Sequence, residues 1–114
     1  MSQTFVVSLI VYTGTDFEQT FVLEDSQSNS IKDLTGYTAC AQMRRYESSA
    51  KTADFTVTFA NDRTTGRIVV SLLASATQNL KPGKYFYDLL LNSPDNTLER
   101  VVEGTVLVKR SVTR

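Results

Sequence analysis

Apolar and polar residues alternate with a period of two along most of the chain, and no long segment carries apolar residues at helical spacing. The clearest alternation lies at residues 54–59, where every second residue is apolar: Phe55, Val57 and Phe59. Successive side chains of a strand point to opposite faces, so this pattern is typical of strands that bury one face. The alternation therefore predicts an all-β fold.

Seven segments of this kind are separated by turn-forming residues. The predicted strands cover approximately residues 6–11, 17–24, 37–44, 54–59, 67–72, 84–92 and 97–110. Many short strands without long helices favour an antiparallel two-sheet sandwich that is immunoglobulin-like in the broad sense. A small barrel is the rival architecture. A chain of 114 residues forms one domain, so we expect a single β-sandwich domain over residues 1–114.

Polar and turn-forming residues mark the connections between the predicted strands. Loops and turns are predicted at residues 24–33, 47–52, 61–66 and 94–96. Residues 75–80 predict one short helical turn, which a following Lys-Pro-Gly sequence ends. Gly104 interrupts the last strand and predicts a bulge or bend at that position.

The composition removes several kinds of chemistry. The chain has no histidine, so it lacks the commonest general base. Its one cysteine, Cys40, can form neither an intrachain disulfide nor a cysteine-based metal site. The five glycines are isolated, so there is no glycine-rich phosphate loop. We expect a protein that is not an enzyme, with no catalytic, cofactor-binding or metal-binding residues and no cofactor.

Charge and hydropathy argue against three further kinds of partner. The formal net charge is zero, whereas a dedicated nucleic-acid binder is basic. No apolar run approaches the ~20 residues that a membrane-spanning helix needs, and no basic residue precedes the first apolar run as in a secretory signal. We expect neither nucleic acid, nor a membrane, nor a small-molecule substrate as a partner.

The balanced total hides an asymmetry of charge along the chain. Residues 1–43 hold five carboxylates and one lysine, and residues 44–114 hold eleven basic and seven acidic residues. The two parts therefore carry net charges of −4 and +4. Two interpretations stay open. The charges could belong to solvated sheet faces of different sign, or to a heterologous contact in which the acidic part of one copy meets the basic part of the next.

The first strand is a candidate for a contact with another subunit, because residues 5–12 are apolar on both faces. We expect this strand to pair with a neighbouring subunit or to pack beneath one. Two small basic clusters add polar groups to the candidate surface. The candidate subunit-contact residues are Phe5, Val7, Leu9, Val11, Arg44, Arg45, Lys109 and Arg110.

Asp88 lies within an otherwise apolar segment and needs a partner if it is buried. Arg44, Arg45 or Arg100 could supply that partner across neighbouring strands. We interpret Asp88 as half of a cross-strand ion pair that fixes the register of the sheet, rather than as a catalytic group. Cys40 falls on the polar side of its strand, and we interpret it as a small strand residue.

Three segments carry motifs in a fixed order: an LTGY strand opening, a PG-x-Y-x-Y-D strand and a VVEG strand. They cover residues 33–45, 80–89 and 101–108. From about Phe17 onward the chain thereby resembles a family of small virion structural proteins of tailed bacteriophages. That family includes proteins of cyanobacterial phages and adaptor domains of baseplates and receptor-binding apparatus. Cys40 departs from the family's pattern, in which a charged residue such as Arg is expected at this position.

The resemblance implies a protein that assembles with other virion proteins and carries no catalytic residues. We expect a homo-oligomer in the tail, baseplate or fibre-attachment region of a virion that is assembled in the host cytoplasm. A decoration protein of the capsid surface is the first alternative. A carbohydrate- or host-surface-binding module is the second, with five tyrosines that could stack on sugars: Tyr12, Tyr37, Tyr46, Tyr85 and Tyr87.

Overall fold

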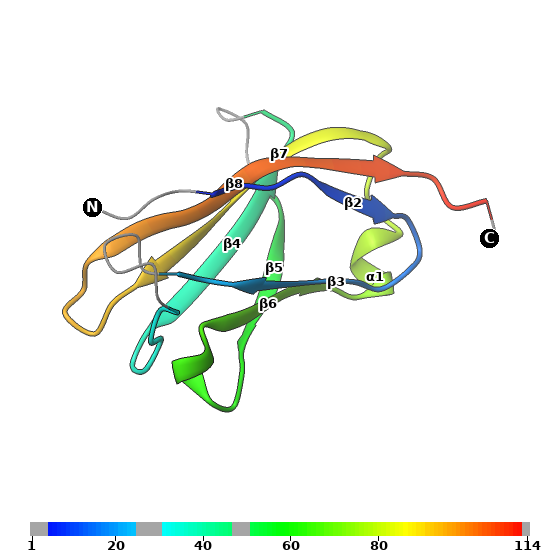
Figure 1. Ribbon diagram of the computed structural model, residues 1–114. Helices are drawn as coiled ribbons and strands as arrows, with labels where there is room; N and C mark the ends of the chain where they lie inside the picture. Colours follow the sequence, from blue (N-terminus) through cyan, green and yellow to red (C-terminus); the bar gives the residue numbers. More distant parts are fainter. Residues whose placement is uncertain (1–4, 25–30, 47–50, 113–114) are drawn as a thin grey trace.

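Strands make up most of the computed structural model, which describes residues 5–24, 31–46 and 51–112 (Figure 1). The strands are β1 (Phe5–Val6), β2 (Leu9–Tyr12), β3 (Phe17–Val22), β4 (Thr38–Arg44), β5 (Lys51–Phe59), β6 (Arg67–Leu72), β7 (Gly83–Asn92) and β8 (Leu98–Lys109). Two short helices in the described residues are η1 (Arg63–Thr65) and α1 (Ala74–Thr77). The predicted all-β fold is confirmed.

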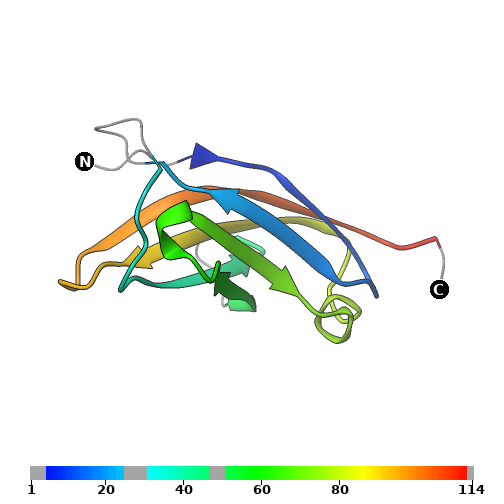
Figure 2. The same ribbon diagram turned by 60° about the horizontal axis from the view of Figure 1, so that its bottom comes forward.

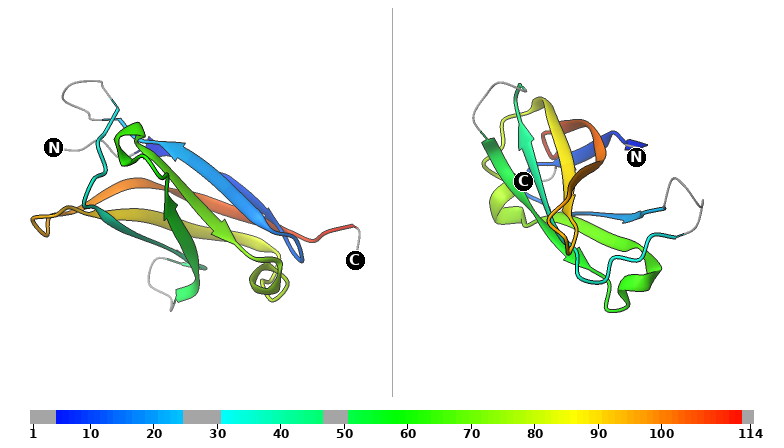
Figure 3. Two further views of the ribbon diagram at one scale, coloured as in Figure 1. Left: turned by 90° about the horizontal axis from the view of Figure 1, so that it is seen from below. Right: turned by 90° about the vertical axis from the view of Figure 1, so that its left-hand side faces the viewer.

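The strands follow one continuous hydrogen-bonded order, β1-β8-β7-β4-β5-β6-β3, with β2 also paired to β8. β5 belongs to both halves of this order, because Ala53 and Phe55 pair with β4 while residues 56–59 pair with β6. The sheet curls at β5 and folds over on itself, as Figure 3 shows. Figure 2 shows β3 and β6 in front of β7 and β8. The observed architecture is therefore one curled sheet.

The hydrophobic core fills the inside of the curl. It consists of Leu9, Val11, Phe21, Leu23, Leu34, Ala41, Met43, Phe55, Ile68, Val70, Leu72, Leu80, Tyr85, Tyr87, Leu89, Leu91, Val101, Val102, Val106 and Val108. The Phe55 ring packs edge-on against Tyr87 at 6.0 Å between centroids and lies 6.1 Å from Phe17. The predicted alternation of buried residues is confirmed along β7, where every second residue is buried. Burial of these side chains is the main stabilising contribution to such a fold.

β1 and β2 pair with β8 in parallel, so the predicted antiparallel arrangement is wrong for these two strands. The single strand predicted at residues 6–11 is interrupted at Val7 and Ser8. The backbone N–H of Val7 still donates to the carbonyl of Glu103 at 2.9 Å, while the Val7 carbonyl accepts from the Tyr87 hydroxyl at 2.7 Å. A buried phenol therefore ties the first strand to β7 through a carbonyl that no ladder bond uses.

A bulge in β8 corrects the interpretation of Gly104. The register between β7 and β8 shifts so that Leu89 faces Val102 and Leu90 faces Arg100, which leaves Val101 as the extra residue. Two consecutive buried valines result, as a bulge requires. The bulge thus lies three residues before Gly104. Gly104 instead leaves room for the first strand, because a Cβ atom there would overlap the carbonyl oxygen of Val7.

Replacing Tyr87 by Phe tests the bond to the first strand. We expect Tyr87→Phe to lower the free energy of unfolding by about 1 kcal/mol at neutral pH, because the Val7 carbonyl loses its hydrogen bond. Urea denaturation of the two proteins measures the difference. A matched variant, Tyr85→Phe, loses a 2.7 Å bond to the Lys81 carbonyl and leaves the first strand untouched. Amide exchange of β1 and β2 should therefore accelerate in the first variant alone.

The same variant has a pH signature. Burial raises the pKa of Tyr87 from 10.0 to about 12. Between these values the unfolded phenol has lost its proton and the folded phenol has kept it, so unfolding releases a proton and stability falls as the pH rises. Tyr87→Phe removes this pH-dependent loss. The deficit in its free energy of unfolding, relative to the unmodified chain, should therefore shrink between about pH 10 and about pH 12. A deficit that stays constant from about pH 10 to about pH 12 would contradict the buried phenol.

The predicted helical turn is confirmed as α1, which begins one residue earlier than expected. Two residues of the connection between β2 and β3 hold it in place. A carboxylate oxygen of Asp16 accepts from the backbone N–H of Ala74 at 2.7 Å, and the hydroxyl of the buried Thr77 donates to the Thr15 carbonyl at 2.7 Å. These bonds fix the crossover from β6 to β7 at the end of the molecule where β7 begins.

The turn between β7 and β8 is observed as predicted. The backbone N–H of Asn96 donates to the Ser93 carbonyl at 2.9 Å, which places Pro94 at the second turn position. Of the loops predicted before β4 and β5, residues 25–30 and 47–50 lie outside the described residues.

Candidate functional site

The predicted contact residues of the first strand divide between the core and the surface. Leu9 and Val11 are only 4% and 0% exposed and point into the curl. Val7 packs partly buried against the same core, whereas Phe5 is exposed. The prediction that Leu9 and Val11 form a subunit contact is therefore corrected: both side chains belong to the core of their own chain.

The outer side of the same strand carries the exposed apolar residues instead. Val6, Ile10 and Tyr12 are 75%, 50% and 47% exposed. In the parallel ladder with β8, Ile10 lies opposite Leu107 and Tyr12 lies opposite Lys109. The sequence pattern could not distinguish the two sides, because both are apolar. Pairing with β8 decides which side is buried.

An exposed surface with apolar and basic side chains continues from this strand across β8 to β7. Leu107 is exposed and pairs with Lys84 of β7. We define the basic face as Ile10, Tyr12, Lys84, Leu107 and Lys109, all of which are exposed. Its apolar centre and charged rim are the usual anatomy of a protein interface.

The other predicted basic contact residues lie near the basic face. Arg110 follows Lys109 directly and is exposed. Arg45 is also exposed, and its guanidinium lies 5.0 Å from the centroid of the Tyr85 ring. Arg44 differs from these residues because it is half-buried. The structure thus places three of the four predicted arginine and lysine residues on the surface.

Arg44 lines a groove of about 500 Å³ on the outer side of β4, β7 and β8. The Arg44 guanidinium donates to the side-chain carbonyl of Gln42 at 3.2 Å. In the same groove, Nε of Arg100 donates to Oδ2 of Asp88 at 3.2 Å. Arg100 is therefore the cross-strand partner that Asp88 was expected to have. The pair joins β7 to β8, and its partial exposure keeps its contribution to stability small.

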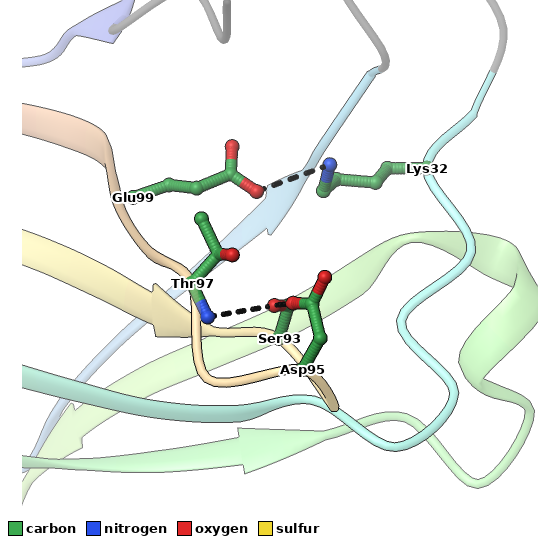
Figure 4. A network of polar contacts seen from close by, with 5 residues as sticks. All are labelled: Lys32, Ser93, Asp95, Thr97 and Glu99. Carbon is green, nitrogen blue, oxygen red and sulfur yellow. Dashed lines mark hydrogen bonds and ion pairs between the residues drawn. The ribbon is translucent and has the colours of Figure 1, made fainter.

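Three loops share a pattern that sequence reasoning missed, an aspartate followed two residues later by a threonine. The pairs are Asp33 and Thr35, Asp62 and Thr64, and Asp95 and Thr97. In the first two loops the carboxylate accepts the threonine backbone N–H at 3.0 Å and the threonine hydroxyl. In the third, the Ser93 hydroxyl donates to Asp95 and accepts the Thr97 N–H (Figure 4).

These local hydrogen bonds fix the charge of the three aspartates. Hydrogen bonds from Thr35 and Thr64 lower the pKa of Asp33 and Asp62 below the ordinary 3.8, and those from Ser93 and Thr97 do the same for Asp95. Each carboxylate therefore stays ionised at neutral and mildly acidic pH. We call Asp33, Asp62 and Asp95 with their loops the acidic loops.

The acidic loops are neighbours, at the end of the molecule where β7 ends and β4 begins (Figure 1). The backbone N–H of Leu34 donates to the Arg63 carbonyl at 2.9 Å, which joins the first loop to the second. A Cβ atom on Gly36 would lie 2.8 Å from the Pro94 ring, so the first loop also touches the third. Residues from three separate parts of the sequence thus form one acidic surface.

Two nearby cations are engaged in internal contacts rather than facing the acidic loops freely. Lys32 lies 3.6 Å from the Glu99 carboxylate, and both side chains are only about 15% exposed (Figure 4). The Arg63 guanidinium donates to the Tyr37 carbonyl at 2.6 Å and lies 4.0 Å from the Phe59 ring centroid. These partly buried cations bind the loops together, so their charges are directed toward internal partners rather than toward the exposed carboxylates.

A hollow of about 560 Å³ adjoins the acidic loops. Val22 and Ile31 line it and are about half exposed, and Asp62 lies at its side. Its complete lining is Val22, Ile31, Ala60, Asp62, Thr64, Thr65 and Arg67. The hollow therefore combines exposed apolar groups with polar ones.

The tyrosines expected to stack on sugars do not form one set. Tyr85 and Tyr87 are buried in the core, which corrects their assignment as surface platforms, while Tyr12 and Tyr46 are exposed. Cys40 is an exposed free thiol, as its strand position indicates. Within residues 5–24, 31–46 and 51–112, no three or more His, Cys, Asp or Glu side chains are grouped as metal ligands, and no helix has the length and apolarity to cross a membrane.

Comparison with known proteins assigns no family. No protein-family model and no curated protein matches the chain. Among solved structures, an internalin-like protein of Listeria monocytogenes aligns with 96% of this chain at 16% sequence identity and a TM-score of 0.45. The chain spans 29% of the length of that protein. Similarity at this level does not assign a function.

Proposed function

We propose that the chain is a non-enzymatic structural protein of a tailed-phage virion, located in the tail, baseplate or fibre-attachment region. It acts through contacts with other virion proteins and with further copies of itself. In this proposal the chain assembles in the host cytoplasm and takes no cofactor, small-molecule substrate, nucleic acid or membrane as a partner. Decoration of the capsid surface is the alternative location.

The placement of the three motif-bearing segments is the main support for this proposal. The LTGY segment leads into β4, the PG-x-Y-x-Y-D segment forms most of β7 and the VVEG segment lies within β8. β7 pairs with both β4 and β8, so segments far apart in the sequence form three adjacent strands. A resemblance that follows one continuous structural unit supports a shared fold better than matches scattered over the surface.

We also propose that the curled sheet is an immunoglobulin-like sandwich in which β5 is shared by the two layers. The pairing of β3 with β6, and of β7 with β4 and β8, matches the strand neighbours of such domains. The Tyr85 hydroxyl donates back to the Lys81 carbonyl at the start of β7, which is the position of a tyrosine corner. An experimental structure in which β5 does not join the two layers would refute this assignment.

Mass spectrometry of purified particles, from the phage whose genome encodes the chain, tests the proposed function. We expect peptides of the chain in washed, intact particles at a low copy number relative to the major capsid protein. A copy number close to that of the capsid protein would favour the decoration alternative. Complete absence from the particles would refute both locations.

A further inference from the structure

The basic face and the acidic loops lie at different places on one chain. β7 connects them, because it begins at Gly83 beside Val108 and ends at Asn92 beside Leu98. Lys84 of the basic face lies at the first of these ends, and Asp95 of the acidic loops follows the second. The molecule is elongated, with principal extents of 44, 31 and 21 Å, so the two surfaces do not overlap.

We propose that the basic face of one copy docks onto the acidic loops and adjoining hollow of a second copy. The proposal deepens the proposed structural function, on which it rests for the expectation that the chain forms oligomers. The contact is heterologous, since the two partners use different surfaces. Each copy can therefore hold one neighbour at each end, and the contact builds open chains or rings.

Charge complementarity identifies a second copy as the occupant. The basic face carries Lys84 and Lys109, with Arg110 directly after them. The acidic loops carry three ionised aspartates, and the nearby cations Lys32 and Arg63 are held in internal contacts. Arg67 is exposed in the adjoining hollow, so the three carboxylates outnumber the one exposed arginine there. Surfaces of opposite sign steer encounter and select against wrong orientations. Two basic faces, or two sets of acidic loops, would repel each other.

Apolar complementarity supports the same pairing. Ile10, Tyr12 and Leu107 form the exposed centre of the basic face. The hollow beside Asp62 exposes Val22 and Ile31, which have no apolar cover in the part of the chain that the structure describes. Burying these groups against each other supplies the non-polar contribution that exposed charges alone do not give.

Each surface of the proposed contact combines residues that are far apart in the sequence. Asp62 and Asp95 belong to the part of the chain with net charge +4, yet folding brings them beside Asp33. Lys109 and Tyr12 come from opposite ends of the sequence and lie opposite each other in the β2–β8 ladder. A heterologous contact was one of the two interpretations that the sequence left open, and the proposal assigns it to different residues.

Two variants separate the two surfaces. The first, Lys84→Glu with Lys109→Glu, reverses the charge of the basic face and keeps the acidic loops intact. The second, Asp33→Asn with Asp62→Asn and Asp95→Asn, removes the charge of the acidic loops and keeps the basic face intact. Asparagine retains a side-chain oxygen that can accept the loop hydrogen bonds, so the turns are preserved. Thermal denaturation of each variant checks that it folds.

Sedimentation velocity at low ionic strength is the measurement. We expect the unmodified chain to sediment faster as its concentration rises, and each variant alone to associate at least about tenfold more weakly. Raising the salt concentration to roughly 0.5 M should weaken association of the unmodified chain. An equimolar mixture of the two variants should form a 1:1 dimer and nothing larger, because only one productive pair of surfaces remains.

Other outcomes would overturn the contact. If the unmodified chain stays monomeric at roughly millimolar concentration and low salt, the two surfaces do not bind each other and the proposed contact is refuted. Folded variants that associate as well as the unmodified chain, or a mixture that stays monomeric, also refute it. A monomeric chain that is nevertheless found in particles would remove this contact and leave the proposed function standing. If the chain associates but is absent from particles, the contact stands and the proposed function is refuted.

Discussion

Gly104→Ala is expected to lower the free energy of unfolding by about 3 kcal/mol. A Cβ atom at this position would overlap the carbonyl oxygen of Val7 and lie 2.9 Å from its carbonyl carbon. The first strand would have to move away from β8. It would then lose the bond from the Tyr87 hydroxyl and the bond from its own N–H to the Glu103 carbonyl. Urea denaturation measures the change in stability.

Gly14→Ala is the matched control. Gly14 has a φ of 77°, which costs alanine about 1 kcal/mol, but a Cβ atom there would meet nothing within 4 Å. Gly104 also has a positive φ, of 159°, so both substitutions strain the backbone, and the steric contact with Val7 adds to the loss at Gly104 alone. Equal losses in the two variants would show that the close approach of the first strand contributes nothing.

Leu89→Ala is expected to be the other most damaging substitution, at about 4 kcal/mol. Leu89 is fully buried in the middle of β7, between Ala41 of β4 and Val102 of β8. Removing three side-chain carbons leaves a cavity that strands paired on both sides cannot collapse to fill. The midpoint of thermal or urea denaturation reports the loss.

The neighbouring leucine provides the comparison, because Leu90 points to the outer side of the sheet and is only half-buried. Leu90→Ala is expected to cost about 1 kcal/mol. A loss at Leu90 that equals the loss at Leu89 would mean that the outer side of β7 is buried too. Measuring both variants at several protein concentrations would reveal whether a second copy buries it.

The all-β architecture could be predicted because strands that bury one side have apolar residues at every second position of the sequence. Along residues 54–59 the alternation is clear: Phe55 is buried, and Val57 and Phe59 pack partly buried against the core. At residues 5–12 both sides are apolar, so the pattern could not indicate that Leu9 and Val11 would be buried. The parallel pairing with β8 is a contact between the two ends of the chain, which no local signal specifies.

The candidate surface could be predicted only in part. Exposure of Arg45, Lys109 and Arg110 follows from their charge, because an unpaired cation is costly to bury. The grouping of the acidic loops depends on which turns meet at one end of the sheet, and this is set by strand order. The repeated aspartate-x-threonine pattern was visible in the sequence and would have identified each loop as a structured turn. It would not have shown that the loops touch.

The parallel pairing of β1 and β2 with β8 has a consequence for mechanics. The chain enters the sheet at Phe5 of β1 and leaves it at Lys109 of β8, and because β1 and β2 run parallel to β8, these two points lie toward opposite ends of the pairing with β8 (Figure 1). Tension applied between these ends would act along the strands, so the hydrogen bonds joining β2 to β8 would bear load together in shear rather than open one at a time. A chain built in this way would carry a pulling force along its strands.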